Sequence, residues 1–267
     1  MTVVGSVNLD LVARCERLPR AGETLTDATF ARYPGGKGAN QAVGAARLGA
    51  EVTFVGSVGE DAFADEALAG LGEAGVETRL RRGGATGVAL IIVDAVGENQ
   101  IVVAPGANAE LAGVEVGGAV LSQLEIPVAA VEAAAEGAER FFLNAAPARP
   151  VPAALVRKAM LVVVNRYELE ALPETPRLTA LTLGEEGAVL LEEGREVARA
   201  SAPRVRAVDG TAAGDAFTAC LVVSQLEGRD WDEALRRACA AGALAASRTG
   251  ARPSLPTAAE VDAVLRR

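Results

Sequence analysis

The chain has 267 residues, 50% of them hydrophobic, a formal net charge of −9 and no histidine. The negative charge argues against nucleic acids and anionic membranes as partners because both bind basic surfaces, and no apolar run approaches the ~20 residues of a membrane span. The absence of histidine excludes Ser–His–Asp and Cys–His catalysis, so proton transfer falls to carboxylates, lysine, tyrosine or cysteine, of which we favour carboxylates.

The cysteines Cys15, Cys220 and Cys239 are odd in number and far apart in the sequence. Such a distribution argues against a disulfide framework and for a reducing compartment. Met1 leads directly into an apolar run with no basic segment before it, so we expect no signal peptide. These observations predict a cytoplasmic protein.

Short apolar runs alternate with alanine-rich helical patterns along most of the chain. We expect strands at residues 1–7, 52–55, 141–144, 161–165, 178–182 and 188–191, and helices at residues 40–48, 62–73, 127–136, 152–159, 212–226, 232–247 and 258–266. This alternation is typical of βα units and predicts an α/β fold around a mostly parallel sheet. We find no internal repeat or linker, so residues 1–267 are expected to form a single domain.

Two segments, at about residues 11–34 and 86–104, break this alternation. Both have the pattern of extended ribbons with turns, and the second turns near Gly97 between two apolar runs. A small separate sheet accounts for this pattern, and so does an ordinary hairpin packed on the main sheet.

A glycine-rich loop at residues 34–38 precedes the helix expected at residues 40–48. Glycines let a ligand approach the backbone closely, and Lys37 and Asn40 offer hydrogen-bond donors to a polar ligand. The loop is not a Walker A loop because Gly38 follows the lysine where serine or threonine is required. A flexible loop with an exposed lysine is the alternative interpretation.

Polar residues lie at or just after the expected strand ends. They are Asn8, Asn144, Asn165 and Thr182. Ligands of parallel sheets bind at the carboxyl ends of the strands, so the pattern is consistent with one shared site. Polar residues at strand ends are also ordinary turn formers.

The segment at residues 208–217 places Ala212, Ala213 and Gly214 just before Asp215 and an apolar helical run. A tight turn of small residues can aim backbone amides outward at a helix N-terminus, which is a favourable place for an anion. This pattern suits phosphoryl transfer, because amides hold the migrating negative charge while a carboxylate takes a hydroxyl proton. A simple helix cap, with Asp215 as a first-turn acid, is the alternative.

Together these segments resemble the ribokinase-like (PfkB) family of sugar kinases, and the resemblance runs along nearly the whole chain. Further matching segments lie at residues 5–10, 19–24, 97–99, 106–109, 123–125, 144–149, 182–184 and 250–254. The resemblance implies a three-layer αβα sandwich in which segments 11–34 and 86–104 form a small β-sheet lid. Such a lid would exclude water from the site and carry the contact of a homodimer.

The resemblance also implies an ATP-dependent sugar kinase, and the sugar-side motifs favour D-ribose, phosphorylated at O5. Asp215 matches the catalytic base, and Ala212, Ala213 and Gly214 match the anion hole for the γ-phosphate. The positions that match sugar-binding residues are Asn8, Asp10, Gly36, Lys37, Asn40, Glu125 and Asp215.

Nucleotide and metal positions follow from the same resemblance. The nucleotide-side positions are Asn165, Thr182, Gly184, Gly187, Gly214 and Cys239. Glu168, with Asn165, matches a motif that organises Mg²⁺ largely through water. An activating K⁺ is implied at a loop that comprises Asp209, Thr211, Ala245, Arg248, Gly250 and Ser254.

Three features depart from the family pattern. Residues 170–181 leave little room for the helix usual beside the nucleotide, Gly210 replaces the usual threonine of the cation loop, and Cys239 stands where many relatives have Asn or His near adenine. The alternatives are a kinase for another pentose, another sugar or a nucleoside, and, from a different class, a non-catalytic sugar-binding regulator. The few aromatic residues argue against a nucleoside, and the retained Asp215 argues against a regulator.

Overall fold

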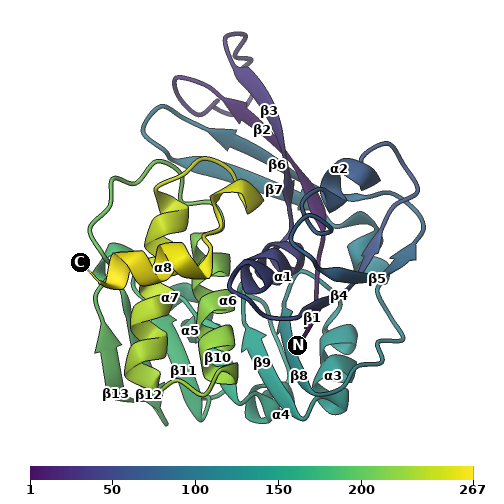
Figure 1. Ribbon diagram of the computed structural model, residues 1–267. Helices are drawn as coiled ribbons and strands as arrows, with labels where there is room; N and C mark the ends of the chain where they lie inside the picture. The colour runs from purple at the N-terminus through teal and green to yellow at the C-terminus, as the bar shows by residue number, and fades with distance from the viewer. Residues whose placement is uncertain (267) are drawn as a thin grey trace.

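The computed structural model describes residues 1–266, which form a nine-stranded main sheet and a separate four-stranded sheet (Figure 1). In spatial order the main sheet contains β13 (Arg195–Ala200), β12 (Ala188–Glu192), β11 (Leu178–Thr182), β10 (Leu161–Val164), β9 (Arg140–Asn144), β8 (Ala119–Gln123), β1 (Thr2–Val4), β4 (Thr53–Val58) and β5 (Glu77–Arg82). Neighbouring strands from β5 to β11 pair in parallel, whereas β12 pairs antiparallel with both β11 and β13. The expected α/β class with a mostly parallel sheet is therefore confirmed.

The central strands are buried on both faces, which gives the molecule three layers. All four residues of β10 are buried, and Val163 belongs to one apolar cluster while Val162 and Val164 belong to the other. Continuous β-branched runs of this kind are typical of parallel strands covered by helices on both sides. The first cluster contains α1 (Lys37–Arg47), α6 (Ala213–Leu226), α7 (Trp231–Ala246) and α8 (Ala258–Leu265), which lie on the near side in Figure 1, and the second contains α3 (Val128–Gly137) and α4 (Ala153–Lys158).

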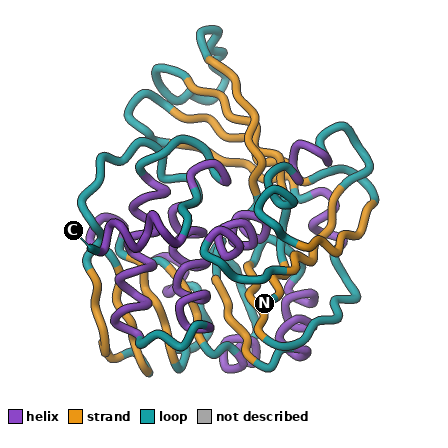
Figure 2. The backbone as a smooth tube through the Cα atoms, in the orientation of Figure 1, coloured by secondary structure: helices purple, strands orange, loops and turns teal. Residues whose placement is uncertain are grey.

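The two segments that break the βα alternation form the smaller sheet, which projects from one end of the main body (Figure 2). Its strands, in spatial order, are β3 (Thr29–Gly35), β2 (Asn8–Arg14), β6 (Gly87–Val93) and β7 (Asn99–Ala104). The register sets Asn8 opposite both Gly35 and Gly87, at the junction with the body. A separate lid sheet, rather than a hairpin packed on the main sheet, is what the chain forms.

Several element boundaries differ from those expected. The strands β5, β8 and β13 and the short helix α5 (Arg166–Glu170) were not expected, because β5 and β13 are charged edge strands and β8 ends in the polar pair Ser122 and Gln123. The helix α2 (Ala64–Leu68) is shorter than residues 62–73, since Ala69 leaves the helical conformation and Gly70 has a φ of 84°. Short 3₁₀ helices complete the described chain as η1 (Gly106–Glu110), η2 (Gly184–Glu186) and η3 (Arg252–Ser254).

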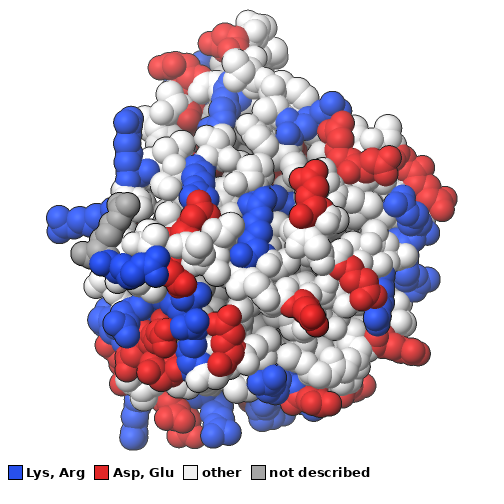
Figure 3. Space-filling view, in the orientation of Figure 1, with Lys and Arg blue, Asp and Glu red and all other residues white. Residues whose placement is uncertain are grey.

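The surface carries charges of both signs. On the face shown in Figure 3, basic and acidic side chains are interspersed over the helical layer rather than gathered into one basic area. Within residues 1–266, no helix combines the length and apolar character needed to cross a bilayer.

Candidate active site

A cavity of about 640 Å³ lies between the lid and the carboxyl ends of the main-sheet strands. The lid contributes apolar side chains to it, including Ile91, Ile101 and Val103. The body contributes polar groups, and the cavity brings together all of the positions assigned to a sugar: Asn8, Asp10, Gly36, Lys37, Asn40, Glu125 and Asp215. Asn165, Glu168, Thr182, Asp209, Thr211, Ala212 and Gly214 line the same cavity.

The glycine loop is pressed against the turn between β1 and β2. Gly36 has a φ of 89°, and a Cβ placed there would lie 2.7 Å from the backbone N of Asn8 and 2.8 Å from Cα of Val7. The backbone N–H of Lys37 donates to Oε2 of Glu125 (3.0 Å), so an acid from the neighbouring segment holds the first turn of α1. The loop is fixed by these contacts, which places Lys37 and Asn40 at the cavity.

Asp215 lies in the first turn of α6 and is only 6% exposed. Its Oδ2 accepts from Nδ2 of Asn40 (2.9 Å), and its Oδ1 accepts from Nε2 of Gln41 (2.9 Å). Burial raises the pKa of Asp215 above its ordinary value, while Lys37 and the hydrogen bonds from Asn40 and Gln41 lower it and offset part of that rise. A buried carboxylate with a raised pKa is a suitable proton acceptor.

Carboxylates crowd around the only lysine of the site. Burial alone lowers the pKa of Lys37, but Asp215, Glu125, Glu168 and Asp10 raise it above its ordinary value, so the ammonium stays charged. Burial, and to a smaller extent the neighbouring Glu125, raise the pKa of Asp10 to about 7. The cavity therefore presents two cations, Lys37 and Arg14, and several carboxyl groups to a ligand, which suits a polyol that both donates and accepts hydrogen bonds.

Asn108, in η1, determines how Asn8 faces the cavity. Its side chain pairs with both backbone groups of Val7, accepting from N (2.9 Å) and donating to O (3.0 Å). Its Nδ2 also donates to Oδ1 of Asn8 (2.8 Å), which leaves Nδ2 of Asn8 as the end available to a ligand. No role was expected for Asn108 from the sequence, although it lies in the matching segment at residues 106–109.

The N-terminus of α6 has an unusual conformation. Ala212 is left-handed, with a φ of 61° and a ψ of 6°, and among the described residues no side chain caps this helix. Asn165, Asp230 and Thr257 cap α5, α7 and α8 through their side chains, whereas in the described chain α1 to α4 lack a side-chain cap as α6 does. The left-handed Ala212 and the uncapped start leave backbone amides that can bind an anion, with Asp215 as the acid of the first turn.

A second cavity, of about 720 Å³, lies on the other side of this helix end. It is lined by Gly184, Gly187 and Cys239, among other small residues. Burial raises the pKa of Cys239 to about 12, so its side chain is a neutral thiol in the wall. The two cavities share the residues Thr182, Ala207, Gly210 and Gly214. Two molecules, one bound in each cavity, would thus meet at the α6 N-terminus.

Asn165 and Glu168 form a reciprocal cap at the start of α5. Oδ1 of Asn165 accepts from N of Glu168 (2.9 Å), and Oε2 of Glu168 accepts from N of Asn165 (2.8 Å). Burial raises the pKa of Glu168 above its ordinary value, although the hydrogen bond from Asn165 lowers it. Both residues therefore have a structural role as well as a place in the wall of the first cavity.

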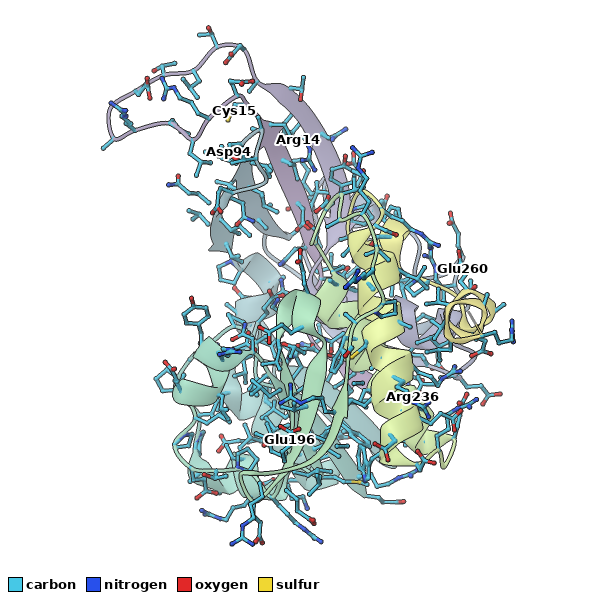
Figure 4. All side chains as sticks on the ribbon, turned by 90° about the vertical axis from the view of Figure 1, so that its left-hand side faces the viewer. Arg14, Cys15, Asp94, Glu196, Arg236 and Glu260 are labelled. Atoms are coloured by element: carbon cyan, nitrogen blue, oxygen red, sulfur yellow. The ribbon has the colours of Figure 1, made fainter. Side chains whose placement is uncertain are left out.

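Asp209 is the centre of the loop assigned to a monovalent cation. Its Oδ1 accepts from N (3.0 Å) and Oγ1 (2.5 Å) of Thr211, and its Oδ2 accepts from N of Gly250 (3.0 Å). Burial raises the pKa of Asp209, but the Thr211 and Gly250 hydrogen bonds and Arg14 outweigh it, so the pKa lies below its ordinary value. Nη2 of Arg14 lies 3.3 Å from Oδ2, and Figure 4 shows Arg14 on the lid sheet, with α7 and α8 below it.

The other residues of that loop make different contacts. Arg248 does not contact Asp209 but pairs with Glu260 (2.5 Å), and Oγ of Ser254 donates to O of Ala251 (2.7 Å). The carbonyl of Ala245 accepts from N of Arg248 (3.1 Å). The arginine that reaches Asp209 thus comes from the lid, which a sequence pattern could not indicate because 195 positions separate Arg14 from Asp209.

Comparison with known proteins gives concordant matches over the whole chain. Residues 1–258 match the model of the pfkB family carbohydrate kinases. A ribokinase of Bacillus subtilis is 37% identical over 98% of both chains, and a deoxyribokinase of Salmonella typhi is 32% identical over 96% of this chain and 95% of its own. The structure of Arabidopsis thaliana ribokinase complexed with ribose and ATP is 31% identical, with a TM-score of 0.88 over 100% of this chain and 98% of that one.

Proposed function

Because the chain belongs to the pfkB family of carbohydrate kinases, we propose that it transfers the γ-phosphoryl group of ATP to O5 of D-ribose and forms ribose 5-phosphate. The observation that carries this proposal is the position of the α6 N-terminus. Its uncapped amides and Asp215 lie where the two cavities meet, so the sugar would occupy the lid-side cavity and the nucleotide the other.

In this mechanism, Asp215 accepts the proton of the O5 hydroxyl as O5 attacks the γ-phosphorus. The new O5–P bond forms as the bond from that phosphorus to the bridging oxygen of ADP breaks, and the electron pair leaves with ADP. The turn at Ala212, Ala213 and Gly214 directs amides at the transferred group, and these stabilise its charge without reorganising. General-base catalysis of this kind contributes about 10²–10⁴-fold in rate.

Sugar recognition is assigned to the polar side of the lid-side cavity. Asn8, Asp10, Lys37 and Asn40 would bind the hydroxyls, with Gly36 allowing close approach and Glu125 holding the loop. A hydroxyl in the wrong place would leave one of these groups unpaired, at a cost of about 1–3 kcal/mol. In the part of the chain that the structure describes, no aromatic side chain lines this cavity, which favours a free sugar over a nucleoside base that needs stacking.

A second candidate substrate is 2-deoxyribose. The Salmonella typhi deoxyribokinase has nearly the same identity to this chain as several ribokinases. Both sugars carry an O5 hydroxyl in reach of the same base, so the reaction would be the same and only the hydroxyl contacts would differ.

The nucleotide-side assignments rest on the second cavity and the adjoining strand ends. Thr182, Gly184, Gly187, Gly214 and Cys239 line that cavity, and Asn165 lies beside it in the first. The Glu168 carboxylate with Asn165 fits Mg²⁺, because that ion prefers oxygen ligands and keeps several of its waters. When bound with the nucleotide, Mg²⁺ would neutralise phosphate charge.

An activating K⁺ is assigned to the loop around Asp209. The oxygen-rich loop continues directly into the turn at Ala212, so an ion bound there would stiffen the anion hole. The carboxylate already accepts from Thr211, Gly250 and Arg14, so K⁺ would have to share it with the Arg14 guanidinium.

The outer face of the lid suits contact with a second copy of the chain. Ile91, Ile101 and Val103 face the cavity, and the residues that alternate with them in the strands face away from it. Among these, Leu90 is 50% exposed and Val102 is 65% exposed. An exposed apolar face of this kind favours a homodimer.

The test is ADP release measured across a panel of pentoses, hexoses and nucleosides at saturating ATP and Mg²⁺. We expect the highest kcat/KM with D-ribose. A clear preference for 2-deoxyribose or a nucleoside would replace ribose as the substrate, and the absence of turnover with every acceptor would support the regulator instead.

A further inference from the structure

Gln41 lies directly behind the proposed base and has no exposed surface. It belongs to α1, next to Asn40, and its Nε2 donates both to Oδ1 of Asp215 (2.9 Å) and to Oδ1 of Asn144 (2.9 Å). An apolar residue would suffice to fill the space between α1 and the sheet, since a buried amide is costly unless its polar atoms find hydrogen-bond partners. The polar side chain and its contacts therefore require a separate explanation.

A backbone carbonyl determines which end of the Gln41 amide faces Asp215. Nδ2 of Asn144 donates to O of Val163 (3.1 Å), so Oδ1 of Asn144 must face Gln41 and accept from it. The opposite end, Oε1 of Gln41, then accepts from Nε2 of Gln123 (2.6 Å). Asn144 on β9 thus imposes the orientation with the donor end of Gln41 toward the base, and the donation from Gln123 on β8 is consistent with it.

The two oxygens of Asp215 are consequently held by two different amides. Asn40, which lines the sugar cavity, donates to Oδ2, while Gln41, which does not line it, donates to Oδ1. A hydrogen bond to a carboxylate favours its ionised form and fixes the plane of the group. The contact from Gln41 is therefore independent of whether sugar is bound.

We propose that Gln41, oriented by Asn144 and paired with Gln123, is a positioning residue that keeps Asp215 ionised and correctly directed for proton transfer. This inference rests on the proposed function of Asp215 as the base. Gln41 touches neither substrate in this arrangement and acts only through Asp215.

The test compares Gln41→Met with the wild-type chain, and Gln225→Met is the matched control. Gln225, near the far end of α6, is a partly buried glutamine whose Nε2 donates to O of Arg229 and, among the described residues, makes no contact with the site. For Gln41→Met we expect kcat with ribose to fall about 10- to 100-fold, because the variant loses one hydrogen bond to a charged group. The KM for ribose should stay nearly unchanged. The acidic limb of the kcat–pH profile should move to higher pH, while Gln225→Met should show neither effect.

A direct titration separates this inference from the proposed function. The ¹³C resonance of the Asp215 carboxyl, assigned by its loss in Asp215→Asn, should titrate about one pH unit higher in Gln41→Met than in the wild-type chain. Gln123→Met, which removes only the donor to Oε1 of Gln41, should shift it in the same direction by a smaller amount and serves if Gln41→Met does not fold. An unchanged titration and kcat in folded variants would overturn the role of Gln41, whereas a shifted titration in a chain that phosphorylates no sugar would overturn the proposed function alone.

Discussion

Alanine at Gly36 should damage the sugar site through a close backbone approach, and the structure supplies a control. Gly36 (φ 89°) and Gly49 (φ 100°) both have backbone conformations that alanine rarely adopts. A Cβ at Gly49 meets nothing within 4 Å, whereas one at Gly36 would lie 2.7 Å from N of Asn8 and 2.9 Å from O of Ser6. Both substitutions thus place a side chain at positive φ, and they differ in the contact.

The expected magnitudes follow from that difference. A left-handed conformation costs an L-residue about 1–2 kcal/mol, so Gly49→Ala should lower the free energy of unfolding by about that amount and leave ribose affinity unchanged. Gly36→Ala adds an overpacking cost of about 1–3 kcal/mol, and its contacts are backbone atoms that cannot rotate away. The loop must then move away from Asn8, so the Kd for ribose should rise at least tenfold.

The assay combines urea unfolding with calorimetric titration of ribose for both variants. Equal losses of stability in Gly36→Ala and Gly49→Ala, or an unchanged ribose affinity in Gly36→Ala, would refute the claim that close packing of the loop on the β1–β2 turn builds the site.

Three further predictions concern charge. Asp10 has a folded-state pKa of about 7, above the ordinary 3.8, so the folded chain binds more protons than the unfolded chain between these values. Its free energy of unfolding should therefore fall as pH rises from about 4 to 7. Asp10→Asn should lose this slope when unfolding is measured against pH, and an unchanged slope would contradict the assignment. Lys37→Met should weaken ribose binding far more than ATP binding in calorimetry, with Lys158→Met as the control, and a selective loss of ATP affinity would mean that the loop binds the nucleotide. Potassium, titrated against choline at constant Mg²⁺ and ionic strength, should raise turnover of the wild-type chain without changing its sugar preference. The rise should be steeper in Arg14→Met, because this variant frees the Asp209 carboxylate from the guanidinium. Flat responses in both proteins would remove the ion from the mechanism.

Motif residues and buried strands could be predicted because their patterns are local. Each of the seven sugar-side positions lies in a short segment, such as residues 34–41, and the structure brings all seven to one cavity. The strand β10 was expected because it is a continuous apolar run. The edge strands β5 and β13 carry charges at alternate and neighbouring positions, so a hydrophobic pattern could not indicate them.

The contacts that hold the site together could not be predicted because they depend on tertiary packing. Gln41 and Asn108 lie inside motif segments, but their partners, Asp215 and Asn8, are at least 100 positions away. A polar residue in such a segment indicates a ligand contact and a structural contact equally well. Only the direction of each amide, seen in three dimensions, distinguishes the two.

Turnover of ribose by the wild-type chain and by Asp215→Asn, with ribose affinity measured on the same samples, tests the central claim most directly. We predict that the wild-type chain forms ribose 5-phosphate, and that Asp215→Asn binds ribose similarly but turns over about 10²–10⁴-fold more slowly because an amide cannot accept the O5 proton. Near-normal turnover in a folded Asp215→Asn protein would contradict the account, since it would remove the carboxylate at the α6 N-terminus from the chemistry.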